Sequence, residues 1–236
     1  MNRLRETGMT SKPVLLGPET TDGKPAVEIL SSRVAYEDFV RVTTYKIRTQ
    51  RFDGSWTDPY TRNVMATGES GNAVVVLAYD PERDVVVLVE QFRMPALMRD
   101  RKSAWLLETA AGLIAHGEDP LETAKREVME ETGCTPRRME KVGEMFSGPG
   151  AFAEVLYCYI AAVTAGNSGT THGLAHEEEN IRLHVLTVED AVKLADSGAI
   201  EDIKTVFMLN WLARHHDSLR HRWLSDSGNE DTETGC

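Results

Sequence analysis

The sequence predicts an α/β fold in which helices cover a mixed β-sheet. Two nearly continuous apolar runs in "NAVVVLAYDPERDVVVLVEQFR" surround a proline-containing turn, a pattern typical of buried strands. The later segment "DPLETAKREVMEETG" carries the terminal signals of a helix. Strand and helix segments are interleaved without a strict βαβ rhythm, which favours a mixed sheet.

The chain divides by composition into four segments. Residues 1–26 are rich in Gly, Pro, Thr and charge, so we expect them to be loosely ordered. Residues 27–66 are dense in β-branched and aromatic residues and contain "DGS", a hairpin signal, which predicts a small antiparallel sheet. The main domain is expected over 67–222, and the polar segment 223–236 is expected to be disordered.

Within the main domain, further strands are expected in "AWLLETAAG", "EVLYCYIAAV" and "IRLHVLTV", the first of them running into a loop. Two helices are expected near the C-terminal end, over 188–197 and 201–216. In the helix of "DPLETAKREVMEETG", Asp119 suits the N-cap, Pro120 the first helical position, and Glu122 completes a capping box. Gly133 suits the left-handed position after the last turn.

Composition restricts the possible functions of the 236-residue chain. Its formal net charge is -11 and no basic patch stands out, which argues against nucleic-acid binding. Three scattered cysteines give neither a disulfide framework nor zinc-ligand spacing, so we expect a reducing cytoplasmic location. We find neither a signal peptide nor an apolar run long enough to span a bilayer, and we expect no membrane contact.

The segment "GEDPLETAKREVMEETG" concentrates acidic residues on one helix. On a helical wheel, Glu127 and Glu131 lie side by side at the edge of the apolar stripe, and Glu130 lies beside Glu127 on the outer side. Arg126 projects elsewhere on the wheel and cannot neutralise all three carboxylates. Clustered hard oxygen ligands suit Mg²⁺ or Mn²⁺. Taken alone, however, the cluster is equally compatible with a solvated acidic face. The apolar stripe consists of Leu121, Ala124, Val128 and Thr132.

The spacing of these residues separates the two alternatives. Seven positions follow the order Gly-x5-Glu-x7-Arg-Glu-U-x-Glu-Glu-x-Gly-U, where U is aliphatic, and this pattern resembles the box of the Nudix hydrolase family. A chance match at seven fixed positions has a probability on the order of 10⁻⁸ per window. Cys134 takes the last aliphatic place, where it behaves as a small hydrophobe. The seven residues are Gly112, Glu118, Arg126, Glu127, Glu130, Glu131 and Gly133.

The resemblance implies a Nudix α/β/α sandwich whose loop-helix-loop holds divalent metal against a diphosphate. It makes Glu127 and Glu131 the principal metal ligands, with Glu130 nearby and the carbonyl of Ala111 completing the shell. It further implies that two or more Mg²⁺ ions are bound, with Mn²⁺ as a possible substitute. The remaining box residues have supporting roles: Arg126 and Glu118 hold the loop against the helix and orient the ligands, while Gly112 and Gly133 meet backbone requirements.

The similarity extends beyond the box to the ADP-ribose pyrophosphatase group. The segments "WLLETAAGLI" and "HGLAHEEENIRLHVLTVEDA" resemble that group, and Pro149 lies at its marker position, sixteen residues after Gly133. The group's general base lies in a loop matching "AHEEEN". We therefore expect Glu177 to be the base, with Glu179 as the reserve and Glu130 as a candidate inside the box. An ordinary "GPG" turn and an exposed acidic turn are the alternatives for these two segments.

Three residues match places where the group contacts its substrate. Arg93 and Arg62 are expected to contact phosphate or ribose, because guanidinium suits phosphate geometry. Phe39 is expected to stack on a base, although an aromatic residue in a strand is more often part of a core. His215 and His216, near the C-terminal end, have no partner at metal-ligand spacing, and we interpret them as surface residues.

The expected activity is Mg²⁺-dependent hydrolysis of ADP-ribose to AMP and ribose 5-phosphate. The resemblance also implies a homodimer in which N-terminal strands help to build the partner's site. One alternative is a hydrolase of GDP-mannose or another nucleotide sugar. A second alternative is a non-catalytic module that senses ADP-ribose, although such modules usually have an eroded box and an attached DNA-binding domain.

Overall fold

A computed structural model describes residues 17, 26–68, 71–99, 101, 103–174 and 178–227. The chain forms two compact units, one from Met1–Tyr36 and Val42–Val64 and the other from Glu37–Arg41 and Met65–Cys236. The expected loose segment 1–26 lies outside the described residues, apart from Gly17 and Ala26. No helix in the described part is long and apolar enough to cross a membrane. The cytoplasmic location stays a prediction.

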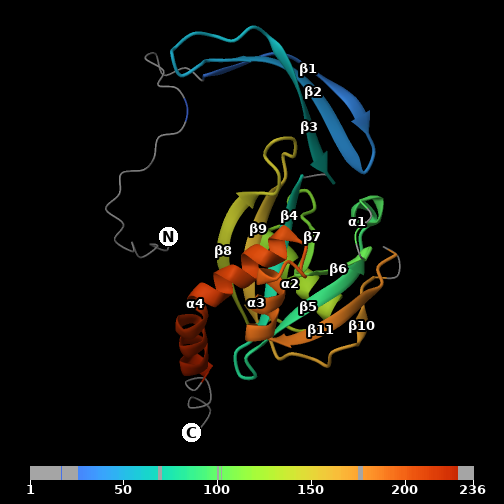
Figure 1. Cartoon of the computed structure of the whole chain (residues 1–236), viewed down its shortest axis with the longest axis vertical. Helices are drawn as coiled ribbons and strands as arrows, with labels where there is room; N and C mark the ends of the chain where they lie inside the picture. Colours follow the sequence, from blue (N-terminus) through green and yellow to red (C-terminus); the bar gives the residue numbers. More distant parts are fainter. Residues whose placement is uncertain are drawn as a thin grey trace. The chain divides into compact units, whose positions relative to one another are not determined.

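The N-terminal strands form a three-stranded sheet in the order β1-β2-β3 (Figure 1). The predicted hairpin signal is confirmed: Gly54 has φ 85°, Asp53 Oδ1 accepts the N–H of Ser55 at 2.9 Å, and Gln50 bridges Trp56 in antiparallel register. Every residue of β1 is exposed in the single chain, although the strand includes large apolar side chains. The strands are β1 (Val27–Glu37), β2 (Val40–Thr49) and β3 (Tyr60–Thr67).

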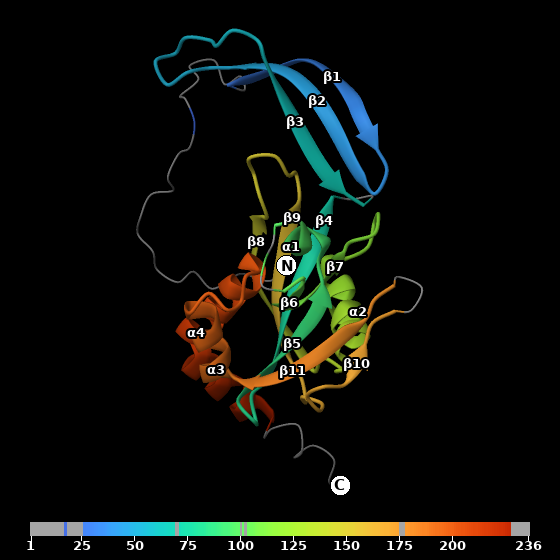
Figure 2. The ribbon, with the colours of Figure 1, turned by 45° about the vertical axis from the view of Figure 1, so that its right-hand side comes forward.

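The main sheet has eight strands and is mixed, as the sequence predicted (Figures 1 and 2). Its central strand β4 runs parallel to β9 and antiparallel to β5. The strand order is β10-β11-β5-β4-β9-β8, with β6 paired to β5 and β7 paired to β4. The strands are β4 (Asn72–Asp80), β5 (Val85–Phe92), β6 (Trp105–Glu108), β7 (Ala110–Leu113), β8 (Arg138–Phe146), β9 (Val155–Ala162), β10 (Thr171–His172) and β11 (Ile181–Thr187).

The segment "AWLLETAAG" was expected to be one strand, but it forms two, β6 and β7, separated at Thr109. The N–H of Thr109 donates to Oγ1 of Thr205 at 2.7 Å instead of to a neighbouring strand. The pairing therefore changes partner at this residue: Glu108 lies opposite Val89 of β5, and Ala110 lies opposite Val76 of β4. The chain thus passes from pairing with β5 to pairing with β4.

Helices cover both faces of the main sheet, which gives the expected α/β/α sandwich. On one face α2 buries Ala124 and Val128 against alternate residues of β4 and β5, such as Val74 and Val87. On the other face α3 and α4 pack against the intervening residues, among them Leu77. Figure 2 shows α2 on the opposite side of the sheet from α3 and α4. The helices are α1 (Met94–Met98), α2 (Pro120–Thr132), α3 (Val188–Asp196) and α4 (Ile203–Ser227).

Helix α4 continues well past its predicted end at 216, because its later turns bury apolar side chains. Leu219 and Trp223 are almost fully buried, and the Trp223 ring packs on Tyr79 with ring centroids 6.1 Å apart. The expectation of a disordered segment from 223 onward is therefore wrong for residues 223–227, which are helical. Residues 228–236 lie outside the described residues.

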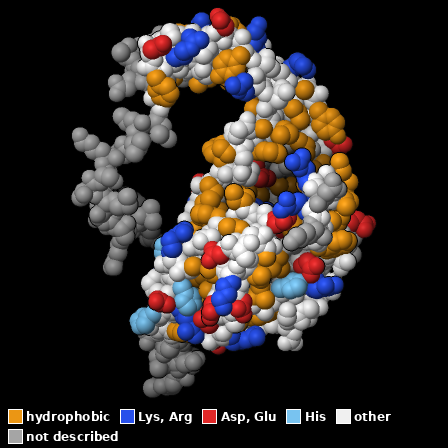
Figure 3. Space-filling view, viewed as in Figure 1, with side chains coloured by type: hydrophobic (Ala, Val, Ile, Leu, Met, Phe, Trp, Pro, Cys, Tyr) orange, Lys and Arg blue, Asp and Glu red, His pale blue; other side chains and the backbone are white. Residues whose placement is uncertain are grey.

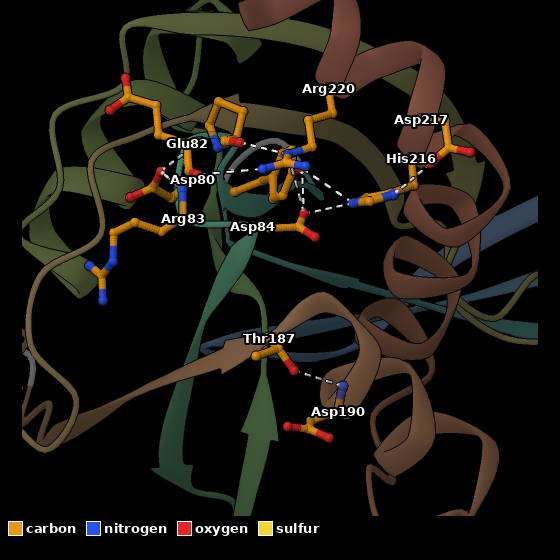
Figure 4. Close-up of polar contacts among 11 residues, drawn as sticks. Asp80, Glu82, Arg83, Asp84, Thr187, Asp190, His216, Asp217 and Arg220 are labelled. Atoms are coloured by element: carbon orange, nitrogen blue, oxygen red, sulfur yellow. Dashed lines mark hydrogen bonds and ion pairs between the residues drawn. The ribbon is translucent and has the colours of Figure 1, made fainter.

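Polar contacts fasten the same part of α4 to the β4–β5 turn (Figure 4). His216 Nε2 lies 2.6 Å from Asp84 Oδ1, which also accepts the hydroxyl of Tyr79 at 2.8 Å. Arg220 Nε donates to the carbonyl of Pro81 at 2.8 Å. His216, interpreted as a surface residue, is in fact half-buried, and its ring bonds to a turn 132 residues away. His215 is exposed, as predicted.

Three elements were not predicted: α1, β8 and β10. Charged residues interrupt the apolar pattern of β8, an edge strand that pairs only with β9 among the described strands. Helix α1 has five residues and begins directly after Arg93, with Pro95 in its first turn. Strand β10 has two residues. Helix α1 and strand β10 are too short to show a periodic pattern in the sequence.

Candidate active site

Helix α2 has the terminal residues that its sequence predicts. The Asp119 side chain accepts the N–H groups of two first-turn residues, and Gly133 ends the helix in the left-handed conformation with φ 66°. A side chain at Gly133 would collide with the ring of His172, because its Cβ would lie 2.6 Å from that ring. The predicted capping box is not formed in full: the Glu122 carboxylate pairs with Lys125 at 2.8 Å.

Two carboxylates of α2 are buried against strand β7. Glu127 is 8% exposed and Glu131 is 2% exposed, whereas Glu130 is half-buried. Glu131 Oε2 accepts the backbone N–H of Ala111 at 3.1 Å, so the helix is bonded to strand β7 at this point. The sequence therefore placed Glu127 and Glu131 correctly at the edge of the buried stripe.

Arg126 reaches more of this cluster than the helical wheel suggested. Its Nη1 lies 2.8 Å from Glu127 Oε1 and 2.7 Å from Glu130 Oε2, and its Nε lies 3.4 Å from Glu118 Oε1. The long side chain bends toward acids that its Cα does not face, which a wheel of Cα directions does not represent. Glu118 also accepts the N–H of Ala115 at 3.3 Å. Arg126 thus links the loop before α2 to the helix.

Gly112 leaves room for the carboxylate of Glu127. A Cβ at position 112 would lie 2.0 Å from Glu127 Oε1, far inside van der Waals contact. Gly112 pairs with Val74 of the central strand β4, so its backbone has little freedom to withdraw. The glycine of the box is therefore a steric requirement for a carboxylate that lies directly against the strand.

Burial raises the pKa of both acids. It raises the pKa of Glu127 to about 7, although the positive charge of Arg126 opposes the rise. Burial also raises the pKa of Glu131 well above its ordinary value. The carboxylate of Glu179 adds to both increases by repulsion, so it lies near the pair. Desolvated carboxylates that repel one another favour either protonation or a bound cation.

These residues fit a divalent cation. No three His, Cys, Asp or Glu side chains among the described residues already converge as a ligand set. Even so, Glu127 and Glu131 are desolvated oxygen donors beside β7, and Glu127 fits there only because Gly112 lacks a side chain. Oxygen donors of this kind suit hard divalent ions such as Mg²⁺ and Mn²⁺. A bound cation would replace the repulsion between the acids with attraction.

The loop before β11 brings a third acid toward α2. Glu179 Oε2 accepts the N–H of Leu174 at 3.1 Å, and the N–H of Gly173 donates to the carbonyl of Glu130 at 3.3 Å. Glu178 is exposed and has a positive φ of 56°. Glu177, the predicted general base, lies outside the described residues. Of the two loop acids named as bases, the structure thus describes only the reserve, Glu179.

Arg93 directly follows β5 and is held by an acid that the sequence analysis did not identify. Its Nε and Nη2 donate to the two oxygens of Glu108, both at 2.8 Å. Glu108 is 1% exposed and ends β6. The available signal was an acid at the end of the apolar run "WLL", where a buried carboxylate requires a partner.

The other predicted substrate contacts come from different elements of the chain. Arg62 is exposed on β3, and its guanidinium lies 4.5 Å from the ring centroid of Tyr60. Phe39 is 69% exposed, so it belongs to no core in the single chain. Pro149 is exposed in the turn between β8 and β9, where the N–H of Phe152 closes on the carbonyl of Gly148 at 2.8 Å. Arg62 belongs to the first unit and the box to the second.

Comparison with known proteins identifies the family. The model of the NUDIX domain matches residues 69–207, which include the whole box and the loop containing Glu179. The chain belongs to the Nudix domain family. This agrees with the carboxylate helix described above, and it makes the protein a Nudix hydrolase. The family assignment also accounts for the mixed sheet between two helical layers.

Curated relatives cover most of the chain. The ADP-ribose pyrophosphatase of Escherichia coli (strain K12) is 36% identical over 203 residues, covering 86% of this chain and 95% of the relative. That of Haemophilus influenzae is 32% identical, covering 84% and 90%. A GDP-mannose pyrophosphatase of Yersinia pestis is 32% identical, covering 72% and 86%. A solved structure, "Crystal structure of ADP compounds hydrolase", shares the fold with a TM-score of 0.61 at 18% identity, over 86% of this chain and 96% of that one.

Proposed function

We propose that this Nudix hydrolase cleaves the diphosphate of ADP-ribose, giving AMP and ribose 5-phosphate. The observation that carries the proposal is the 36% identity to ADP-ribose pyrophosphatase over nearly the full length of both chains. The buried acids Glu127 and Glu131 support it, because the diphosphate of such a substrate is anionic and binds through a cation.

We assign the metal site to Glu127 and Glu131, with the carbonyl of Ala111 and the carboxylate of Glu130 beside them. Glu179 joins this group because it lies near both buried acids. The expected cation is Mg²⁺, in two or more copies, with Mn²⁺ as a substitute. When bound, it would neutralise phosphate charge and acidify water. Arg126 and Glu118 orient the acids, as the hydrogen bonds between loop and helix suggest.

In the proposed hydrolysis, side chains of the protein remove the proton from the attacking water and contact the phosphates. A water oxygen forms a bond to one phosphorus of the diphosphate, and the bond from that phosphorus to the bridging oxygen breaks. A carboxylate oxygen of Glu177 takes the proton that the water loses. Glu179 takes this role only if Glu177 does not. Arg93 contacts the anionic phosphates, since its guanidinium is part-exposed and suits phosphate geometry.

The substrate assignment is tested with a panel of ADP-ribose, GDP-mannose, ADP-glucose, NADH and diadenosine polyphosphates. Phosphate release after coupling to a phosphatase gives kcat/KM for each compound. ADP-ribose is expected to have the highest value. A tenfold preference for GDP-mannose, about 1.4 kcal/mol of transition-state free energy, would support the alternative favoured by the Yersinia relative. Tight ADP-ribose binding without turnover would instead identify a sensing module.

We also propose a homodimer in which the N-terminal strands contribute to the partner's site. The support is that every residue of β1 is exposed in the single chain, with Ile29 at 63% and Tyr36 at 56% (apolar side chains appear in orange in Figure 3). Mixing two inactive variants, Arg62→Ala and Glu127→Gln, tests this arrangement. Activity should return if each site combines residues from two chains. A monomer in light scattering, or inactive mixtures, would exclude it.

A further inference from the structure

Arg93 and Glu108 form a two-pronged ion pair across two adjacent strands: Arg93 directly follows the last residue of β5, and Glu108 is the last residue of β6, opposite Val89. β5 and β6 are antiparallel, with Phe92 opposite Trp105, and the N–H of Arg93 donates to the carbonyl of Ala104 at 2.7 Å. The backbones on both sides of the pair are therefore fixed. Nε and Nη2 of the guanidinium then meet both carboxylate oxygens at 2.8 Å, a geometry that fixes the plane of the guanidinium.

The pair leaves part of the guanidinium available. A guanidinium has five N–H groups, and Glu108 engages two of them, one on Nε and one on Nη2. No other side-chain hydrogen bond of Arg93 is found among the described residues. The Arg93 side chain is 39% exposed whereas that of Glu108 is 2% exposed, and both line a cavity of about 400 Å³. The unused N–H groups are therefore the part of the pair that a ligand in this cavity can reach.

The start of α4 holds Glu108 in place. The next residue, Thr109, donates its N–H to Thr205 Oγ1 at 2.7 Å, and Thr205 in turn donates that hydroxyl to Asp202 at 2.7 Å. Thr109 and Thr205 have no exposed surface. The acid at the end of β6 is thus attached to a helix about a hundred residues further along the chain, and its carboxylate has little room to move.

Charges around the pair leave Glu108 available to Arg93. Lys204 Nζ lies 3.8 Å from Glu108 Oε2 but only 2.6 Å from Asp202 Oδ1, so the lysine has an acid of its own. Arg93 also lies close enough to Glu131 for the two charges to influence each other. Glu108 lies three residues before Ala111, whose N–H donates to Glu131 Oε2 at 3.1 Å, so the pair is near the acids assigned to the metal, where the diphosphate must lie if the proposed function holds.

We propose that Glu108 is a positioning residue: it fixes the plane of Arg93 so that the unused N–H groups face the substrate diphosphate. This role rests on the proposed function, and it extends the site to β6 and to the first turn of α4. Glu108 touches no substrate itself. It reduces the conformational freedom that Arg93 would otherwise lose on binding, which is the benefit of a preorganised site.

A double-mutant cycle tests this role, using wild type, Glu108→Gln, Arg93→Ala and the double variant. Glutamine keeps one acceptor oxygen but turns an N–H group toward the guanidinium, so the fork is lost with little change in volume. Glu108→Gln is expected to raise KM by about 10- to 100-fold, the usual effect of losing a supporting partner, while kcat changes less than about threefold. With Arg93→Ala present, adding Glu108→Gln should change KM less than about twofold.

Asp80→Asn is the matched control. Asp80 is as buried as Glu108, at 1% exposure, but it binds the N–H groups of Glu82, Arg83 and Ala165 at the other end of β4. Asp80→Asn should leave KM unchanged, both in wild type and in Arg93→Ala. If Glu108→Gln raises KM equally with and without Arg93, the acid acts on general structure and the proposal is wrong. An unchanged KM in Glu108→Gln would also overturn it.

Arg93→Lys tests the proposal if Glu108→Gln does not fold. Lysine keeps the charge but cannot form the fork, so KM should rise nearly as much as in Arg93→Ala. A wild-type KM in Arg93→Lys would show that orientation is unimportant and would overturn the proposal. These outcomes are separate from the substrate assignment, which wild type alone tests. If wild type prefers another nucleoside diphosphate derivative, the cycle is run with that compound, because the diphosphate is common to all of them.

Discussion

The box glycine Gly112 and the helix acid Glu127 occupy adjoining space, since a Cβ at position 112 would lie 2.0 Å from the Glu127 carboxylate. Gly112→Ala must therefore displace that carboxylate, the more flexible of the two groups. We expect turnover to fall by at least about a hundredfold while the protein stays folded, because loss of well-placed catalytic geometry has effects of this size.

Gly166→Ala is the control for this substitution. Gly166 has open space around its Cβ direction and no positive φ, so alanine should be accepted there with wild-type turnover. Turnover with a series of Mg²⁺ concentrations, together with circular dichroism, distinguishes a displaced ligand from a lost fold. Wild-type activity in Gly112→Ala would mean that Glu127 need not lie against β7.

We expect each of the two buried acids, Glu127 and Glu131, to be needed for activity but to lower the stability of the metal-free protein. Glu127→Gln and Glu131→Gln should each remove nearly all turnover. Each should also raise the melting temperature in EDTA, because a desolvated, repelled carboxylate is replaced by a neutral amide of the same shape. Added Mg²⁺ should raise the melting temperature of wild type more than that of either variant. Full wild-type activity in EDTA would exclude a metal site here.

Local sequence was sufficient to predict the acidic helix. The 3.6-residue period places Glu127 and Glu131 on one edge, and Asp119 and Gly133 mark the ends, as the structure shows. The same local pattern could not predict the reach of Arg126, because a long side chain can fold back toward neighbours that its Cα does not face.

Contacts between residues that are far apart along the chain could not be predicted from the sequence. Glu108 meets Arg93 only because β6 pairs with β5, and Thr109 meets Thr205 across 96 positions. The same applies to His216, which bonds to Asp84 across 132 positions and is half-buried. Such pairings depend on the strand order, which periodicity does not reveal.

Substitutions of the loop acids Glu177, Glu178 and Glu179 should have different effects on activity. Glu177→Gln is expected to lower kcat by roughly 10²–10⁴, with KM and Mg²⁺ affinity nearly unchanged, because removing only a general base has this effect. Glu179→Gln should instead weaken Mg²⁺ activation, since Glu179 lies near both buried acids. Glu178→Gln should be close to neutral, as Glu178 is exposed. A wild-type kcat in Glu177→Gln, with kcat lost in Glu179→Gln or Glu130→Gln, would reassign the base.

The contact between His216 and Asp84, away from the box, should make a pH-dependent contribution to stability (Figure 4). Burial lowers the pKa of His216, but its hydrogen bonds to Asp84 and Asp217 outweigh this and the net pKa is raised. Burial raises the pKa of Asp84, but bonds from His216 and Tyr79 outweigh this and the net pKa is lowered. The stabilisation by His216 is thus fully present below its unfolded pKa of about 6.5 and is lost as pH rises through its higher folded value.

Asp84 sets the lower limit of this window. Its contribution is present above its unfolded pKa of about 3.9 and is lost as pH falls through the lower folded value. The pair should therefore stabilise the protein most between about pH 4 and 6.5. Because the Asp84 side chain is 36% exposed, solvent screens the attraction, and we expect at most about 1 kcal/mol of unfolding free energy. For a chain of this size that corresponds to roughly 2–4 °C in melting temperature.

Thermal melts of wild type and His216→Gln from pH 5 to pH 9 measure this contribution. The melting temperature of wild type should exceed that of His216→Gln most at the acidic end, and the difference should shrink with rising pH. His215→Gln is the control, because His215 is exposed and its ring bonds to and stacks on Trp211 of its own helix. It should show no such trend. Turnover should be unaffected in both variants. A difference that is constant with pH, or that grows toward pH 9, would mean that His216 contributes by packing against Tyr79 rather than by its charge.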